Sequence, residues 1–290
     1  MTLISPEQIT EVHGGAGMRI TRLVSSAAGL LAVAETGRSA ELIRYDGKGK
    51  EQGRLPVSSL DAGLLRGVAQ DQLGNVALLF RDRNGRTAVS LDSTNNITGI
   101  FPINRAMQGI VLVGQQLYVL SDTFIIRVSD DAVVGQLPQG VRFELVSVRD
   151  EKIVAIDTFS PKIYTVDPRN RNVEDTYVLH APELTTAMQS SVRTDSVTSM
   201  LIFTAAVDAR GTIYGAISPY PNDNATIIKF DEFGNVLGTL HLALPAKNNP
   251  GRPATRPNMA VSLIGVSGDG RALFVYSQPD NIIARYQISK

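Results

Sequence analysis

Short apolar segments alternate with short polar turns along nearly the whole chain, and the alternation recurs six times. In each copy, a turn rich in glycine or charged residues precedes an apolar strand, a polar loop and a second strand that often ends in aspartate. These copies occupy residues 27–46, 73–92, 114–129, 150–167, 210–231 and 269–287. Apolar positions at a fixed spacing within a recurring unit indicate β-structure built from sequence repeats.

Aligning the copies places the same kind of side chain at the same position. The first apolar column consists of Leu30, Val76, Leu117, Ile153, Ile213 and Ala272. The second consists of Tyr45, Leu91, Val128, Val166, Phe230 and Tyr286. Directly before the second column every copy has a polar residue: Arg44, Ser90, Arg127, Thr165, Lys229 or Arg285. Adjacent apolar and polar positions are typical of a strand whose two faces meet different surroundings.

Each copy also has an apolar segment before its turn, and most copies have another after the second strand. In the fifth copy these segments are 198–207 and 235–245. Four short antiparallel strands per unit predict an all-β chain. Stacking such sheets radially buries both faces of each sheet. We therefore predict a six-bladed β-propeller with four antiparallel strands per blade; the alternative, a two-sheet sandwich or barrel, does not require six copies of one column.

The repeat pattern predicts one domain over residues 1–290. The last copy lacks a fourth strand because the chain ends soon after Tyr286, whereas residues 3–12 belong to no copy. We expect residues 1–14 to close the ring as the outer strand of the last blade. Residues 181–197 and 246–258 interrupt the pattern, and we interpret them as insertions.

The composition excludes several classes of function. Twenty-eight basic residues balance twenty-eight acidic ones, so no overall positive field attracts nucleic acid or an anionic membrane. The chain has no cysteine, which excludes disulfide frameworks and thiolate metal sites. No apolar run is long enough to span a membrane, and the N-terminus does not resemble a secretory signal. We predict no nucleic-acid partner and no membrane insertion, and the compartment stays open.

Two motifs suggest a family. Gly-Thr-Ile-Tyr at 211–214 and Thr-Ile-Ile-Lys-Phe-Asp-Glu-Phe-Gly-Asn-Val at 226–236 together resemble a blade of the NHL-repeat and TolB-like six-bladed β-propellers. Residues 150–167 and 269–287 resemble further, degenerate blades. The resemblance implies the architecture and leaves the activity open, because propellers of this type include enzymes, receptors and scaffolds. The excess of arginine over lysine is typical of a GC-rich bacterial gene.

Catalytic and metal-binding motifs are absent from the sequence. Without tryptophan there is neither a Trp-Asp repeat dipeptide nor a sialidase Asp-box, and no Gly-x-Ser-x-Gly elbow occurs. The glycines at 14, 15 and 17 lie between two expected strands, which is not the setting of a phosphate-binding loop. His13, His180 and His241 fall on separate parts of the ring. We predict no catalytic residue, no metal site and no cofactor.

Three functions stay open. The first is a non-catalytic binding or scaffolding module, the second a metal-dependent hydrolase or lactonase of the six-bladed type, and the third a structural subunit of an exported assembly. Lactonase-type propellers hold a metal with Glu, Asn and Asp from different strands. The Glu-Gly-Pro motif of that family is absent here, and Glu144 and Asn258 are isolated candidates. Convergence of such side chains on one ion would distinguish the hydrolase from the binding module.

We expect binding on one face of the ring. The loops between second and third strands and the connections between successive blades lie on the same side, and long loops on a rigid scaffold are where binding usually resides. Arginine and tyrosine are also enriched at interface centres. We therefore predict a protein or small-molecule ligand on this side. The predicted binding residues are Arg81, Arg83, Asp122, Asp157, Tyr220 and Tyr276.

Overall fold

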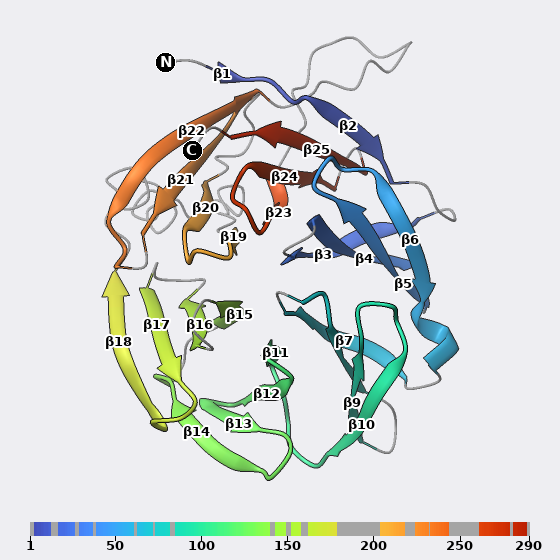
Figure 1. Ribbon diagram of the computed structural model, residues 1–290, viewed down its shortest axis with the longest axis vertical. Helices are drawn as coiled ribbons and strands as arrows, with labels where there is room; N and C mark the ends of the chain where they lie inside the picture. The colour runs from blue at the N-terminus through green and yellow to red at the C-terminus, as the bar shows by residue number, and fades with distance from the viewer. Residues whose placement is uncertain are drawn as a thin grey trace, which may run out of the picture.

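The alternation of apolar and polar positions folds into antiparallel sheets arranged in a ring (Figure 1). In the computed structural model, six sheets contain all the strands of the described residues. These residues are the whole chain except 1–2, 13–16, 27–28, 37–38, 61–62, 72, 82–84, 140–142, 149–151, 158–161, 179–203, 218–223, 232, 244–260, 279–280 and 289–290. The ring of radial antiparallel sheets is a β-propeller, not a two-sheet sandwich.

The first three sheets in chain order each contain four consecutive strands. Sheet 1 consists of β3 (Arg19–Ser26), β4 (Gly29–Thr36), β5 (Ser39–Asp46) and β6 (Glu51–Pro56), followed by the short 3-10 helix η1 (Val57–Leu60). Sheet 2 consists of β7 (Leu64–Gln70), β8 (Val76–Arg81), β9 (Arg86–Leu91) and β10 (Ile97–Ile103). Sheet 3 consists of β11 (Gly109–Val113), β12 (Gln116–Ser121), β13 (Phe124–Arg127) and β14 (Ala132–Gln136).

The other three sheets follow the same order, and two of them also take a strand from the N-terminus. Sheet 4 consists of β15 (Phe143–Val148), β16 (Lys152–Asp157), β17 (Lys162–Asp167) and β18 (Asn172–Val178). Sheet 5 consists of β19 (Thr204–Val207), β20 (Ile213–Ile217), β21 (Asn224–Phe230), β22 (Val236–Ala243) and β1 (Leu3–Ile4). Sheet 6 consists of β23 (Val261–Val266), β24 (Ala272–Ser277), β25 (Ile282–Gln287) and β2 (Gln8–Glu11).

The hydrophobic core lies between neighbouring sheets. The innermost strands contact one another in ring order, β3 to β7, β11, β15, β19 and β23, and β23 contacts β3 in turn. One buried cluster joins sheets 1 and 2 through Leu31 and Phe80, and another joins sheets 6 and 1 through Leu30 and Phe274. Gly265 of β23 directly faces the side chain of Leu30, which would have to shift to admit a Cβ atom at this position. Each sheet is therefore stabilised by burial against its neighbours.

The two apolar columns of the sequence are cross-strand partners. The pairs that lie opposite each other are Leu30 and Tyr45, Val76 and Leu91, Ile153 and Val166, and Ile213 and Phe230. In sheet 6 the register differs by one residue, so that Leu273 rather than Ala272 lies opposite Tyr286. All residues of both columns except Val128 are buried. The repeat in the sequence is thus a repeat of sheet register.

The residues of the polar column are half-buried, and two of its arginines reach a neighbouring sheet. Arg44 of sheet 1 donates through Nη2 to Asn95 Oδ1 at 2.8 Å and through Nη1 to the Gly74 carbonyl at 3.2 Å, both in turns of sheet 2. Arg285 of sheet 6 donates through Nε to the Gly47 carbonyl of sheet 1 at 2.8 Å. Arg44 and Arg285 therefore bind turns of the next sheet.

Aspartates close many of the hairpin turns. In Asp92, Oδ1 accepts the backbone N–H groups of Thr94 at 2.8 Å and Asn96 at 2.9 Å. The same arrangement, in which the Oδ1 atom accepts the backbone N–H groups of the residues two and four positions later, occurs at Asp46, Asp71, Asp208 and Asp231. Side chains of this type hydrogen-bond the backbone two residues on and so favour turns. This explains why the second strand of a repeat so often ends in aspartate.

The N-terminal segment divides between two sheets. Strand β2 pairs antiparallel with β25 as the outer strand of sheet 6, with Gln8 opposite Arg285. We expected residues 3–12 to form one strand there, but β1 instead pairs in parallel with β22 of sheet 5. Pro6 lies between the two strands, and proline cannot donate to a ladder and ends regular pairing. Residues 13–14 and both expected insertions, 181–197 and 246–258, lie outside the described residues.

Removal of residues 1–12 should lower the melting temperature, because it removes the pairing between β2 and β25 and the Glu7–Arg285 ion pair. Each backbone hydrogen bond contributes about 0.5–1.5 kcal/mol net, so we expect a decrease of about 5 °C or more. The exposed edge of β25 should also promote aggregation. Thermal melts and light scattering measure both effects. Removal of residues 1–4 alone is the control and should cost less; equal melts for all three proteins would contradict the expectation.

Acid should destabilise the fold through the turn at Asp92. The hydrogen bond from the Thr94 hydroxyl, together with those from Asn96, lowers the pKa of Asp92 to about 2. Because this pKa is lower in the folded than in the unfolded chain, the turn stabilises the fold above about pH 4 and loses that effect as the pH falls towards about 2. The melting temperature of Asp92→Asn should depend less steeply on pH in this interval. Parallel slopes for the variant and the parent would argue against this role.

Candidate functional site

The second strands of the sheets end on one face of the ring. Every sheet has the same strand order and the innermost strands follow one another around the ring, so β4, β8, β12, β16, β20 and β24 all run in the same direction along the ring axis. We call the side on which these six strands end the loop-rich face. The innermost strand of each sheet begins on the same side. The opposite face carries the other hairpin turns, including those closed by aspartate.

Three of the predicted binding residues lie at this face. Arg81 is the last residue of β8 and is exposed. Asp122 is exposed in the turn between β12 and β13, with a left-handed φ of 55°. Asp157 is the last residue of β16. Arg83 and Tyr220 lie outside the described residues. Arg81, Asp122 and Asp157 thus lie at or just after the ends of second strands, on three different sheets.

Tyr276 is not an exposed binding residue, which corrects our expectation. It lies in β24 with no exposed surface, and burial raises the pKa of its hydroxyl group. The hydroxyl accepts the backbone N–H of Ile20 at 3.0 Å and donates to Asn281 Oδ1 at 2.9 Å. Asn281 Nδ2 in turn donates to the Val12 carbonyl at 3.2 Å. Tyr276 thus holds sheet 6 to sheet 1 and to the N-terminal segment, and a ligand cannot reach it.

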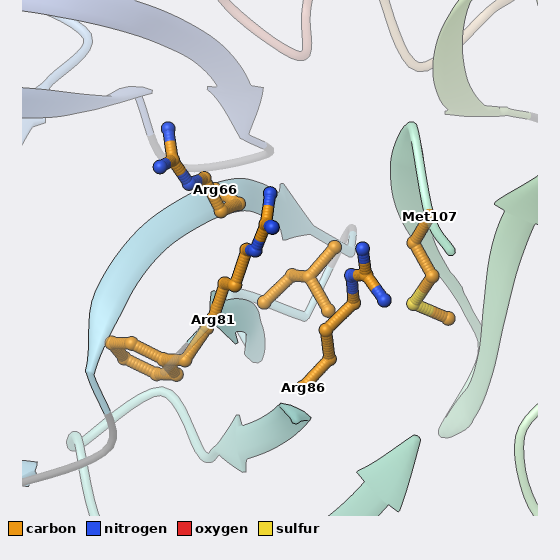
Figure 2. Close-up of a pocket in the computed structure, with 6 residues that line it drawn as sticks. Arg66, Arg81, Arg86 and Met107 are labelled. Carbon is orange, nitrogen blue, oxygen red and sulfur yellow. The ribbon is translucent and has the colours of Figure 1, made fainter. Parts of the chain in front are cut away.

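A pocket of about 250 Å³ opens where sheet 2 leads into sheet 3 (Figure 2). The residues that line it are Arg66, Leu79, Phe80, Arg81, Arg86 and Met107. Leu79 and the partly buried Met107 belong to the hydrophobic cluster between sheets 2 and 3, so the base of the pocket is apolar. Figure 2 shows the three arginine side chains in a row, with Met107 next to Arg86.

A β-bulge positions Arg66. In the pairing of β7 with β8, Leu65 lies opposite Phe80 and Gly67 opposite Leu79, which leaves Arg66 as the extra residue. Its carbonyl accepts a hydrogen bond from Arg22 Nη2 of sheet 1 at 3.1 Å. An extra residue in one strand bends that strand and re-aims a side chain, and such bulges are frequent beside functional sites. The bulge explains how a residue of the innermost strand reaches the same pocket as the ends of β8 and β9.

Arg81 and Arg86 are direct cross-strand partners at the ends of β8 and β9. Arg86 Nη1 donates to the Arg105 carbonyl at 2.9 Å, whereas Arg105 pairs with Asp131. Within the described part of the chain, Arg66 and Arg81 form no ion pair with a carboxylate. Like charges placed directly opposite each other destabilise a sheet. The pocket is therefore a local concentration of positive charge on a chain with no net charge.

Sequence reasoning identified Arg81 but not its two neighbours in the pocket. Arg86 is the first residue of β9 and follows the same polar loop, so the spacing of Arg81 and Arg86 around a short hairpin could have identified it. Arg66 gives no such signal. Its position depends on a bulge that forms only when β7 pairs with β8, and no local pattern marks it. Asp122 and Asp157 are not among the residues that line this pocket.

No metal centre is evident in the part of the chain that the structure describes. No group of three or more His, Cys, Asp or Glu residues that could hold an ion occurs there. Glu144 lies in β15, and Asn258 lies outside the described residues. His241, in the outer strand β22, lies beside Thr226, with Nδ1 3.5 Å from its hydroxyl. A search of the same residues for a helix long and apolar enough to cross a membrane finds none.

Similarity to known proteins is confined to the fold. No family model and no curated protein matches the chain. The structure of the RRP9 WD40 repeats is similar with a TM-score of 0.59 and 11% identity, over 99% of each chain. The β-propeller domain of Myceliophteria thermophila Cps50 (Swd1) has a TM-score of 0.57 and 11% identity, over 97% of this chain and 100% of that one.

Hydrazine synthase of Kuenenia stuttgartiensis is also similar, with a TM-score of 0.55 and 11% identity over 97% of this chain and 98% of that chain. The chain is an all-β propeller. At this level of identity the similarity establishes the antiparallel propeller architecture and no activity. The present chain has the fold of WD40 repeats without containing a single tryptophan.

The substitution Tyr276→Phe should lower stability by about 1–3 kcal/mol, since it leaves the buried N–H of Ile20 without its acceptor and Asn281 without a donor. Chemical denaturation measures the change. Tyr45→Phe is the matched control, because Tyr45 is similarly buried but its hydroxyl has no hydrogen-bond partner among the described residues. We expect a smaller effect there. Equal losses would contradict the role of Tyr276 in joining sheets 6 and 1.

Proposed function

We propose that the protein is a non-catalytic binding or scaffolding module that works through the loop-rich face. The observation that carries this proposal is the exposed arginine pocket on a ring of packed sheets. Arg81 and Arg86 lie opposite each other although like charges weaken a sheet, and Arg66 is directed to the same place by a bulge. The repulsion between Arg81 and Arg86 does not help the protein to fold. Binding of a ligand at the pocket is the better explanation for three arginines at one exposed point.

We also infer a finer architecture. Each of the six sheets is one blade, and residues 1–290 form a single six-bladed domain that β2 closes by pairing with β25. The Gly-Thr-Ile-Tyr and Phe-Gly-Asn-Val segments support an NHL-like or TolB-like type of propeller, and the arginine-rich composition supports a bacterial source. The contact of β23 with β3 favours a ring without a free sheet edge between its first and last blades.

The binding surface in this proposal combines several strand ends. Arg81 contributes to the pocket, Asp122 is exposed in the turn after β12 of sheet 3, and Asp157 is the last residue of β16 of sheet 4. Arg83 and Tyr220 belong to the loops that follow β8 and β20 in the sequence. A protein partner is favoured over a small molecule, because these residues spread over several sheets whereas the pocket itself measures about 250 Å³ and pockets for drug-sized ligands typically start at about 300 Å³.

The similar structures support a binding role only in part. Two of them are described as WD40 repeats or a β-propeller domain, and a further one belongs to the mitotic checkpoint complex, with a TM-score of 0.53 and 10% identity. Hydrazine synthase has the same fold, so the fold by itself favours neither an enzyme nor a scaffold. The proposal therefore depends on the surface of this chain and not on its relatives.

The substitution Arg81→Glu should weaken partner capture without lowering the melting temperature, because it removes a like-charge contact from an exposed strand end. Tagged protein is cross-linked in an extract of the source organism, and the cross-linked peptides are identified by mass spectrometry. We expect cross-links from partner proteins to concentrate at the loop-rich face and their yield to fall in the variant.

The matched control is Lys48→Glu, which reverses one exposed charge in a turn on the opposite face. Its capture yield should equal that of the parent protein. Loss of capture in Lys48→Glu with full capture in Arg81→Glu would place the working surface on the opposite face and refute the proposal.

A further inference from the structure

The arginine pocket indicates what kind of chemical group a partner presents. Three neighbouring strands, β7, β8 and β9, each contribute one arginine, and the described residues supply no carboxylate to Arg66 or Arg81. The guanidinium group is planar and carries its donors in a fixed fork, which matches a carboxylate or a phosphate. An anionic group placed among the three side chains would offset the repulsion between Arg81 and Arg86. The arginine side chains that line the pocket therefore suit an anionic ligand group.

The rest of the pocket narrows the class of ligand. Leu79 and Met107 give it an apolar base, which suits the methylene groups of an acidic side chain. Its volume of about 250 Å³ accommodates a side chain or two and is smaller than typical pockets for drug-sized ligands. Strong binding to nucleic acid requires many phosphate contacts along a positive stripe, whereas this chain has no net charge and concentrates the arginines at one point.

We propose that Arg66, Arg81 and Arg86 bind the carboxylate groups of an acidic peptide segment on a protein partner. This inference rests on the proposed function, because it names the partner chemistry that the loop-rich face recognises. Arg81 and Arg86 hold one carboxylate between the ends of β8 and β9, and the bulged Arg66 contributes a third set of donors from the innermost strand. The methylene groups of the bound side chain contact Leu79 and Met107.

Fluorescence anisotropy with a defined probe tests the proposal. The probe is a fluorescein-labelled twelve-residue peptide in which Glu-Glu pairs alternate with Gly-Ser, and the comparison peptide has Gln in place of every Glu. We expect the Glu peptide to bind at least about tenfold more tightly than the Gln peptide, and Arg81→Gln and Arg86→Gln each to weaken it by about tenfold or more. Arg81→Lys should restore only part of the affinity, because lysine keeps the charge and loses the fork.

Three controls make the result decisive. Lys48→Gln, on the opposite face, should leave the affinity within twofold of the parent. Free glutarate should compete only weakly, because it lacks the peptide context, and a labelled oligothymidylate of equal length should bind more weakly than the Glu peptide. Melting temperatures of Arg81→Gln and Arg86→Gln should not fall, which separates lost binding from lost folding.

Equal binding of the Glu and Gln peptides, or unchanged binding in the arginine variants, would overturn the proposal. Glutarate as tight as the peptide would assign the pocket to a small carboxylate, and tighter oligothymidylate would assign it to nucleic acid; either outcome also overturns it. If the Glu peptide binds no more tightly than the Gln peptide while partner cross-links still concentrate at the loop-rich face, the proposed function survives and only the acidic-peptide inference fails.

Discussion

No sheet of this protein can bury both of its faces by itself, and the rest of the structure depends on that constraint. The apolar columns Leu30 to Ala272 and Tyr45 to Tyr286 become core only where one sheet lies against the next. A linear stack would leave the first and last sheets half exposed. In the ring, β23 contacts β3, and the cluster that contains Leu30 and Phe274 gives sheet 1 the same kind of neighbour as every other described sheet.

Hydrogen bonds between neighbouring sheets fix how one sheet is oriented against the next, which apolar packing alone does not. Burial of a leucine tolerates small rotations, whereas the hydrogen bonds of Arg44 to Asn95 and the Gly74 carbonyl set the position of one sheet against the turns of the next. Arg285 does the same between sheets 6 and 1. The turns can serve as partners because aspartates hold their backbone in place. The packing of one sheet against the next thus depends in part on the aspartates that hold the turns in place.

Much of this architecture could be predicted from the sequence because it depends on local patterns of apolar and polar residues. Periodicity gives the strands, and the alignment of copies gives register pairs such as Val76 with Leu91. Apart from the pairing of the N-terminal segment with the last copy, contacts between distant segments could not be predicted. Tyr276 lies beside a polar loop in the sequence, but it is buried in the cluster between sheets 6 and 1, where Ile20, 256 positions away, donates to its hydroxyl. Arg66 reaches the pocket through a bulge that exists only in the paired sheet, so the site was found only in part.

The position of β2 affects the order in which the molecule can be completed. Strand β2 is separated from its partner by most of the chain, because Gln8 pairs with Arg285 and Glu7 contacts the same arginine across 278 positions. Until β25 has been synthesised, β2 has no antiparallel neighbour in sheet 6. Contacts between such distant residues slow folding. A polypeptide truncated before β25 therefore lacks the partner with which β2 forms the outer edge of sheet 6.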